Sequence, residues 1–243
     1  MVNDFTPLEQ IKNIFGNLLS ELAELISKNG GHLLLVGGSV RDLLIQSTPK
    51  ELDCEVRGMS ISALKNILSQ KYSCSEVGKA FGVIRLKGLP VEIALPRTEI
   101  KSGMGHKGFD ITIDSDLPFE SAVRRRDFTM NAIAIDPLNG EILDPCNGRK
   151  DLKNRILRHI GPAFKEDPLR VLRGMQFISR FDLSPSQETI EICKSMEIEN
   201  LAPERIFEEW KKLVLEGTNM SAGLNFLKDT AWIKYFPELA SLI

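Results

Sequence analysis

Three carboxylates alternate along one short segment, and their spacing could hold a metal ion. Glu51, Asp53 and Glu55 share one face of the segment 51–56 if it forms a strand, while the apolar residues between them share the other face. Acids on one face repel each other, and a divalent cation such as Mg²⁺ or Mn²⁺ commonly holds such a set together. The alternative is that they line an exposed strand face and contact only water.

A glycine pair precedes these acids. Gly37 and Gly38 follow the apolar run 33–36 and lead into residues 39–45, a pattern that predicts a strand, a tight turn and a helix. The unpaired N–H groups of a helix N-terminus suit an anion. A double glycine before a helix is also common for purely structural reasons. The spacing between the glycine turn and the acids is what predicts a site for a triphosphate and its metal.

The elements that must position these residues mix helix and strand patterns. A capping box at Thr6 opens a predicted helix that ends at Asn29, and a second helix is predicted near 60–70. Strands are predicted near 82–87 and 90–95. A further helix near 117–126 and a strand near 132–136 complete this part of the chain.

Two features of this mixed part could also serve a site. Glu92 is the one acid in an apolar strand pattern, and its alternative role is a side chain that faces solvent. Residues 97–116 are rich in glycine and basic side chains and have no periodicity, so a long loop is predicted there. A loop of this length is usually functional or disordered.

From about residue 149 onward, every periodic segment predicts a helix. The predicted helices are 149–156, 168–181, 186–196, 204–216 and 219–228. The change of pattern predicts a boundary between a mixed domain, residues 1–148, and a helical domain, residues 149–243.

The composition is that of an ordinary globular protein. The 243 residues are 42% hydrophobic and 26% charged, enough for one large core or two modest ones. With no signal peptide pattern and no apolar run long enough to span a membrane, a cytoplasmic location and no membrane partner are expected. The four cysteines, at positions 54, 74, 146 and 193, lack the spacing of a zinc site and are expected to be free thiols.

The charge is distributed unevenly. Residues 124–173 hold eleven Lys+Arg against seven Asp+Glu, a net +4, whereas residues 182–243 hold six against eleven, a net −5. A basic segment suits phosphate groups, although a solvated helix face gives the same count.

The start of the helix at 168–181 has two interpretations. Asp167 precedes Pro168, a strong helix start, so Asp167 could be an N-cap. Asp167 and Arg170 also lie three residues apart on one helix face, where an acceptor and a planar set of donors could pair with the edge of a base.

Three segments together resemble a known family. Residues 37–53, 126–132 (RDFTMNA) and 166–173 (EDPLRVLR) look like motifs of the class II tRNA nucleotidyltransferase and bacterial poly(A) polymerase family, whose best-known members are the CCA-adding enzymes. The resemblance extends from about residue 33 to 216. It implies an α+β fold: a polymerase-beta-like nucleotidyltransferase head with a mixed sheet, followed by an all-helical neck.

The resemblance also assigns site residues. It makes Glu51 and Asp53 the metal-binding acids and Glu92 a third catalytic acid; the family normally has aspartate at position 51, so Glu51 is a departure. Its nucleotide-binding residues fall on Gly37, Gly38, Ser39, Arg41, Arg126, Asp127, Asn131, Asp167, Arg170 and Arg173. For Asp127 the alternative is a salt bridge to a neighbouring arginine. At Gln176 some bacterial relatives carry another arginine.

The implied function is template-independent addition of CMP and/or AMP, from CTP and ATP with Mg²⁺ or Mn²⁺, to the 3′ end of RNA, especially tRNA. Poly(A) polymerase is the alternative enzyme. An RNA-binding or regulatory remnant is the alternative of another class, because of Glu51. In the family further domains follow the neck, and this chain stops near residues 236–239, so a truncated protein is expected.

Overall fold

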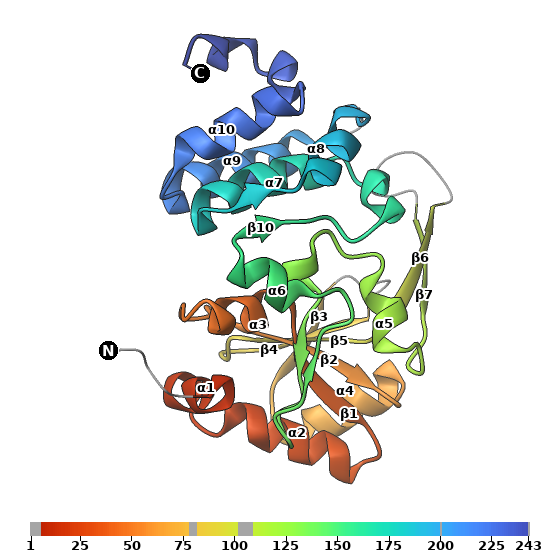
Figure 1. Cartoon of the computed structure of the whole chain (residues 1–243). Coiled ribbons are helices and arrows are strands. Elements are labelled where there is room, and N and C mark those ends of the chain that lie inside the picture. Colours follow the sequence, from red (N-terminus) through yellow and green to blue (C-terminus); the bar gives the residue numbers. More distant parts are fainter. Residues whose placement is uncertain (1–5, 78–81, 102–108, 200, 243) are drawn as a thin grey trace. The chain divides into compact units, whose positions relative to one another are not determined.

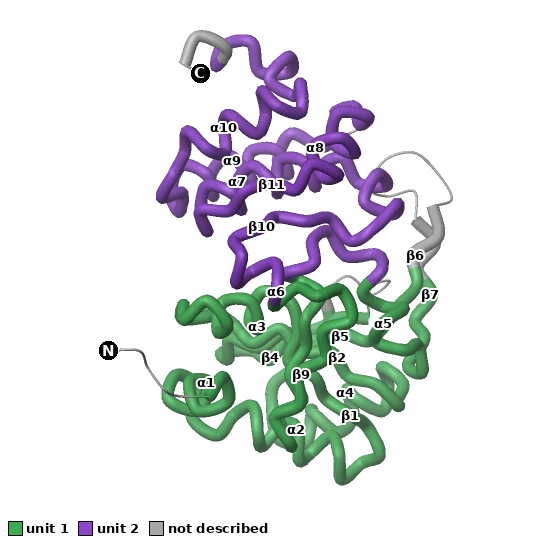
Figure 2. Tube along the Cα trace, in the orientation of Figure 1, with its two compact units in different colours: residues 1–99, 111–123, 131–149 green, residues 100–110, 124–130, 150–243 purple. Residues whose placement is uncertain are grey.

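The computed structural model describes residues 6–77, 82–101, 109–199 and 201–242 (Figure 1). The chain divides into two compact units (Figure 2). Unit 1 consists of residues 1–99, 111–123 and 131–149, and unit 2 of residues 100–110, 124–130 and 150–243. Two short segments that precede residue 148 therefore group with the C-terminal part. The division into a catalytic domain and an RNA-binding domain stays a prediction.

Unit 1 is built on a mixed sheet of seven strands. Their order is β3-β4-β5-β2-β1-β8-β9. The bounds are β1 (His32–Val36), β2 (Leu52–Arg57), β3 (Cys74–Val77), β4 (Val83–Leu86), β5 (Val91–Ala94), β8 (Ala134–Ile135) and β9 (Ile142–Leu143). Only β2 and β5 pair in parallel, and the other neighbours are antiparallel. The predicted mixed sheet is confirmed, but β3 was missed by the sequence analysis.

The alternating pattern of β2 places its apolar residues in the core, as predicted. Leu52, Cys54 and Val56 are at most 2% exposed and form part of the core. Burial raises the pKa of the Cys54 thiol, as expected for a structural cysteine. All four cysteines are free thiols, as predicted.

The helices of this region are short. They are α1 (Pro7–Phe15), α2 (Leu18–Lys28), α3 (Gly37–Leu44), α4 (Ile61–Ser69), α5 (Phe119–Val123) and α6 (Gly148–Lys153). The capping box at Thr6 is present, with its hydroxyl accepting from Glu9 N at 3.3 Å. The prediction of one helix up to Asn29 was wrong. Gly16 has a φ of +63°, which L-residues rarely adopt in a helix, and separates α1 from α2.

The segment 97–116 is also more regular than predicted. Strands β6 (Arg97–Lys101) and β7 (Phe109–Ile113) pair in a separate two-stranded sheet. The centre of the predicted loop, residues 102–108, lies outside the described residues. The sequence analysis missed this strand pair because only Ile100 is apolar in Arg97–Lys101, so that segment shows no apolar alternation.

Unit 2 is mostly helical, close to the predicted ranges. Its helices are α7 (Leu169–Phe181), α8 (Gln187–Lys194), α9 (Pro203–Glu216) and α10 (Met220–Asp229), with short 3₁₀ turns at Pro162–Glu166, Trp232–Tyr235 and Pro237–Leu242. The expectation of helices alone was wrong in one detail. Strands β10 (Ile156–Leu157) and β11 (Ser184–Pro185) form a short parallel pair.

The core of unit 2 forms around α7, which packs against α9 and α10. Phe128 contacts Phe164 and Phe177 edge to face, with ring centroids 5.3 and 5.9 Å apart. A Cβ atom at Gly174 would lie 3.1 Å from a ring carbon of Phe226, so glycine allows this close packing. In the described part of the chain no helix is long and apolar enough to span a membrane.

Candidate active site

The sheet of unit 1 brings two of the predicted acids together. Asp53 on β2 and Glu92 on β5 are register partners on neighbouring parallel strands, so their side chains leave the same face side by side. Both are partly exposed. Glu51 lies just before β2, two residues from Asp53, and is exposed. Asp53 and Glu92, 39 positions apart in the sequence, thus lie together at one acidic edge of the sheet.

The glycine turn lies against this edge. Helix α3 begins directly at Gly37, whose φ of +67° favours glycine. A Cβ atom at Gly38 would lie 3.4 Å from Asp53 Oδ2 and 3.5 Å from Arg41 Nη2. The turn, one metal-binding candidate and one phosphate-binding candidate are therefore neighbours, as the spacing predicted.

Arg41 is buried and fixed by two neighbours. Its Nε and Nη2 atoms donate to Asp42 Oδ1 at 2.9 and 2.7 Å, and its Nη1 atom donates to Asn131 Oδ1 at 2.8 Å. The Arg41 side chain is only 8% exposed. The structure thus joins two predicted nucleotide-binding residues, Arg41 and Asn131. Asp42, which accepts two hydrogen bonds from the Arg41 guanidinium, was not identified as a site residue in the sequence.

Ser39 connects α3 to the start of β2. Its hydroxyl donates to the carbonyl oxygen of Glu51 at 2.9 Å and accepts from the N–H of Asp53 at 2.8 Å. The residue is 2% exposed. Both hydrogen bonds are made to the backbone of the acid-bearing segment.

Glu92 has a cationic neighbour that the sequence analysis missed. Arg85 is its register partner on β4 and donates from Nε to Glu92 Oε2 at 2.7 Å. This hydrogen bond raises the pKa of Arg85. The sequence does mark this position, because Arg85 is the only charged residue in the apolar segment 83–86.

Glu55 differs from the other acids of β2. It is 2% exposed, and its Oε1 accepts from Arg57 Nε and Nη2 at 3.1 and 2.9 Å. Arg57 also donates to the carbonyl of Leu117. Among the described residues, no three His, Cys, Asp or Glu side chains are grouped closely enough to hold a metal ion by themselves.

In unit 2, Asp127 makes the salt bridge that was its alternative role. Its Oδ2 accepts from Arg173 Nε and Nη2, each at 2.7 Å, and its Oδ1 accepts from the N–H of Phe128. Glu209 lies 3.9 Å from Arg173 on the other side. Burial alone would lower the pKa of Arg173, but the charges of Asp127 and Glu209 outweigh it and raise that pKa.

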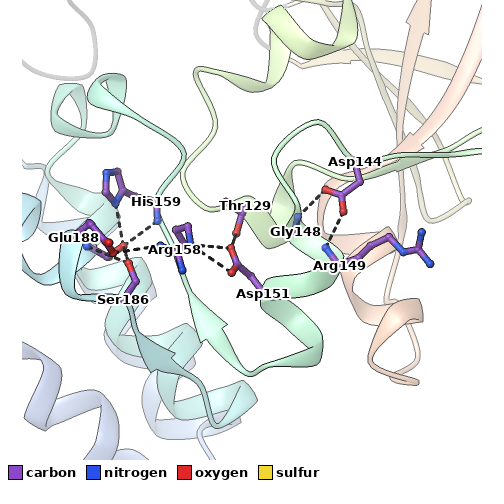
Figure 3. A network of polar contacts seen from close by, with 10 residues as sticks. Thr129, Asp144, Gly148, Arg149, Asp151, Arg158, His159, Ser186 and Glu188 are labelled. Carbon is purple, nitrogen blue, oxygen red and sulfur yellow. Dashed lines mark hydrogen bonds and ion pairs between the residues drawn. The ribbon is translucent and has the colours of Figure 1, made fainter.

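The segment that carries Asp127 is tied to the rest of unit 2 by a polar network (Figure 3). Thr129 donates from Oγ1 to buried Asp151 at 2.8 Å, and Arg158 lies 3.2 Å from the same carboxylate. Arg158 also pairs with Glu188 at 3.2 Å. His159 Nδ1 is 3.0 Å from Thr189 Oγ1. Backbone hydrogen bonds join the same two segments on both sides of Phe128, because Thr129 N donates to Arg158 O at 2.9 Å and Ile160 N donates to Asp127 O at 3.2 Å.

Asp167 and Arg170 are both engaged within unit 2. Asp167 accepts from the N–H of Leu169 at 3.1 Å and from Arg205 Nη2 at 2.8 Å. Arg170 donates to the carbonyl oxygens of Ala163 and Arg125 at 2.7 and 2.6 Å. The capping bond exists, although Pro168 holds the N-cap position itself. Arg205 carried no signal in the sequence, because it lies 38 positions away.

Two other predicted positions lie in unit 2. Arg126, in the segment 124–130, is partly exposed. Gln176 is 1% exposed and accepts from Arg180 Nη1 at 3.1 Å, so its side chain is part of the helical core.

Comparisons with known proteins identify the family of this chain. The model of the poly(A) polymerase head domain matches residues 33–158, and a model described as the probable RNA and SrmB-binding site of polymerase A matches residues 182–243. A multifunctional CCA protein of Xanthomonas campestris is 40% identical over 86% of this chain and 52% of its own length. The chain thus spans about half the length of the curated relatives it matches.

Solved structures give the same result. A Thermotoga maritima CCA-adding enzyme complexed with tRNA superposes with a TM-score of 0.76 at 25% identity, covering 94% of this chain and 54% of that one. A Bacillus stearothermophilus CCA-adding enzyme in complex with CTP gives 0.72 at 26% identity, covering 91% and 51%. Since the head-domain match alone covers more than half of the residues, the chain belongs to the class II CCA-adding enzyme and poly(A) polymerase family of nucleotidyltransferases.

Proposed function

We propose that this chain transfers CMP and AMP from CTP and ATP to the 3′ end of tRNA, as a CCA-adding nucleotidyltransferase. The single observation that supports this most is the register of Asp53 beside Glu92, with Gly38 and Arg41 against Asp53. Acids and phosphate-binding groups are the two components that nucleotidyl transfer requires. The relatives named as CCA proteins support the choice of substrate.

The chemistry is a displacement at phosphorus. The 3′ hydroxyl oxygen of the RNA forms a bond to the α-phosphorus of the nucleotide, the bond to pyrophosphate breaks, and the hydroxyl loses its proton. The N–H groups of Gly37, Gly38 and Ser39 at the start of α3 are suited to phosphate oxygens, except that Gly37 N also donates to Ile133 O at 3.3 Å. Arg41, held in place by Asp42 and Asn131, would balance negative charge.

The acids fit a divalent ion. Mg²⁺ and Mn²⁺ prefer oxygen ligands, and Mg²⁺ is commonly bound by one or two carboxylates together with substrate phosphates. Asp53 and Glu51 would hold the ion, and Glu92 would orient the attacking hydroxyl. A bound ion would stabilise charge on the phosphates and the leaving group. Glu55 is a poor substitute for the family aspartate, because its carboxylate is buried against Arg57.

The residues of unit 2 would recognise the nucleotide and the RNA. Arg126, Asp127 and Arg173 are proposed to bind phosphate and ribose, and Asp167 and Arg170 to read the base. Residues 1–148 would then act as the catalytic domain and residues 149–243 as the RNA-binding domain. The match of residues 182–243 to a model described as a probable RNA-binding site supports this division.

Two other functions can be tested in the same experiment. Poly(A) polymerase is favoured by the description of the head-domain match. A remnant with weakened catalysis is favoured by Glu51, because the extra methylene displaces the carboxylate by about 1.5 Å.

The test incubates the chain with Mg²⁺, labelled CTP and ATP, and tRNA that lacks its CCA end, and sequences the products. Addition of C, C and A, or a part of that sequence, supports the proposal. Addition of a long run of A would favour a poly(A) polymerase. Binding of tRNA without transfer by the wild type, with no gain in Glu51→Asp, would favour the remnant.

A further inference from the structure

The side chain of Ser39 makes both of its strong hydrogen bonds within the protein. Its one O–H donates to Glu51 O, and its oxygen accepts from Asp53 N. The residue is 2% exposed. Its hydroxyl proton can reach a phosphate only if the bond to Glu51 breaks, so a phosphate contact by this hydroxyl is disfavoured. The backbone N–H of Ser39 remains available for that purpose as part of the first turn of α3.

The two hydrogen bonds lie where the pairing of β2 with β1 ends. The pairing of β1 with β2 runs from His32 opposite Arg57 to Leu35 opposite Cys54. Asp53 is one residue beyond the last pair, and Glu51 is three beyond. On that side the Ser39 hydroxyl therefore replaces the strand ladder for the two acid-bearing residues. On the other side, Leu52 N donates to Pro90 O at 2.7 Å.

We infer that Ser39 is a positioning residue for the acid pair: its hydroxyl fixes the backbone of Glu51 and Asp53 and so the separation of their carboxylates. The inference rests on the proposed function, in which these two acids hold the metal ion. Metal sites depend strongly on the groups that orient their ligands, and loss of such a group typically costs about 10- to 100-fold in metal affinity or activity. The Ser39 hydroxyl acts through the ligands and does not itself need to touch the ion or the nucleotide.

The test compares Ser39→Ala with Ser60→Ala in the full chain. Ser60 also accepts a backbone N–H bond, from Ala63 at 3.2 Å, but it caps α4 away from the acids. The binding of Mn²⁺ to metal-free protein is measured by the loss of the electron paramagnetic resonance signal of free Mn²⁺. Ser39→Ala should weaken Mn²⁺ binding by about tenfold or more, and Ser60→Ala should not change it.

Steady-state kinetics supply a second measurement. Ser39→Ala should lower kcat for nucleotide transfer by a similar factor of about ten and change KM for CTP little, because the hydroxyl positions acids and not the nucleotide. A raised KM with unchanged Mn²⁺ affinity would mean that the hydroxyl binds substrate, and would overturn the inference.

The exchange rate of the Asp53 amide hydrogen separates this inference from the proposed function. A hydrogen-bonded amide exchanges slowly, so Ser39→Ala should speed exchange at Asp53 while Ser60→Ala leaves it unchanged. Equal exchange in the wild type and Ser39→Ala would overturn the role of Ser39 even in an active enzyme. If the wild type instead binds no Mn²⁺ and transfers no nucleotide while Asp53 is protected, the proposed function fails first, and the assigned purpose of the hydroxyl fails with it.

Discussion

The two units hold their charged site candidates in different ways. In unit 1, Glu51 and Asp53 are placed by the backbone, through the register of β2 with β5 and the hydrogen bonds of the Ser39 hydroxyl. In unit 2, Asp127 and Asp167 are placed by arginine side chains, Arg173 and Arg205. The first arrangement leaves a carboxylate partly exposed on a rigid strand. In the second arrangement, each carboxylate and its arginine partner hold each other in place through hydrogen bonds.

The difference teaches how function and stability are coupled in each unit. An acid positioned by its own backbone can be replaced with little loss of stability, because the ladder bonds persist. An acid that pairs with an arginine cannot, because removing one partner leaves the other charge poorly compensated. Substitution of Asp53 should therefore affect mainly activity, whereas substitution of Asp127 or Asp167 should affect activity and stability together.

The largest effect is expected for Asp53→Ala. Loss of a metal-binding carboxylate should remove several kcal/mol of transition-state stabilisation and lower nucleotide incorporation by about 10³-fold or more. The loss of unfolding free energy should be smaller than that of Glu55→Gln, because the backbone hydrogen bonds of β2 persist. Incorporation of labelled CMP and urea unfolding measure the two effects. Normal incorporation by this variant would remove Asp53 from the site.

Glu55→Gln is the matched control on the same strand. It removes the buried charge that pairs with partly exposed Arg57, so it should destabilise the protein by about 2–3 kcal/mol, with much less effect on incorporation per folded molecule. If Glu55→Gln were the inactive and stable variant, the assignment of the two acids would have to be exchanged.

The second prediction concerns the Asp127–Arg173 pair. Asp127→Ala and Arg173→Ala should each lower the unfolding free energy by about 2–3 kcal/mol, below the range for fully buried pairs because Arg173 is 32% exposed. The double variant should be less destabilised than the sum of the two single variants. Urea unfolding of all four proteins gives the coupling energy. Additive losses would show that the pair does not support unit 2 in the way its geometry implies.

The third prediction separates base reading by Asp167 from helix capping. Asp167→Asn keeps an acceptor for the N–H of Leu169, whereas Asp167→Ala should cost about 1 kcal/mol. If Asp167 reads the base, Asp167→Asn and Arg170→Ala change the ratio of CTP to ATP use. Arg205→Ala is the control, because it removes the ion pair and keeps the carboxylate. An unchanged ratio in Asp167→Asn, with a larger loss of stability in Asp167→Ala than in Asp167→Asn, would leave Asp167 as a cap.

The smallest effect is a pH dependence from His159. Burial lowers its pKa from the ordinary 6.5, and Arg158 lowers it further, although Glu188 opposes this. The unfolded chain therefore binds more protons than the folded chain between the two pKa values, and stability falls as the pH drops through 6.5. Because His159 is partly exposed, the slope should be shallow. His159→Gln should make the urea midpoint fall less as the pH drops across this range. An unchanged fall in this variant would show that other groups cause it.

Much of this protein could be predicted from local patterns. The strand at 33–36, the glycine turn and the helix after it were predicted correctly, because a continuous apolar run, a glycine pair and a helical pattern are all local signals. The helices of unit 2 were located within a few residues for the same reason. Two kinds of error remained. Gly16 divides one predicted helix into two, and short strands such as β3 and β10 show no period in the sequence.

The sequence by itself determined which residue types are present and which lie on one face of one element. It placed Asp53 opposite the apolar side of β2 and Asp167 at a helix start. Only the tertiary structure decided their partners, because strand register and helix packing join residues that are far apart in the chain. Arg205 is 38 positions from Asp167 and Asn131 is 90 positions from Arg41, and no local periodicity carries information over such separations.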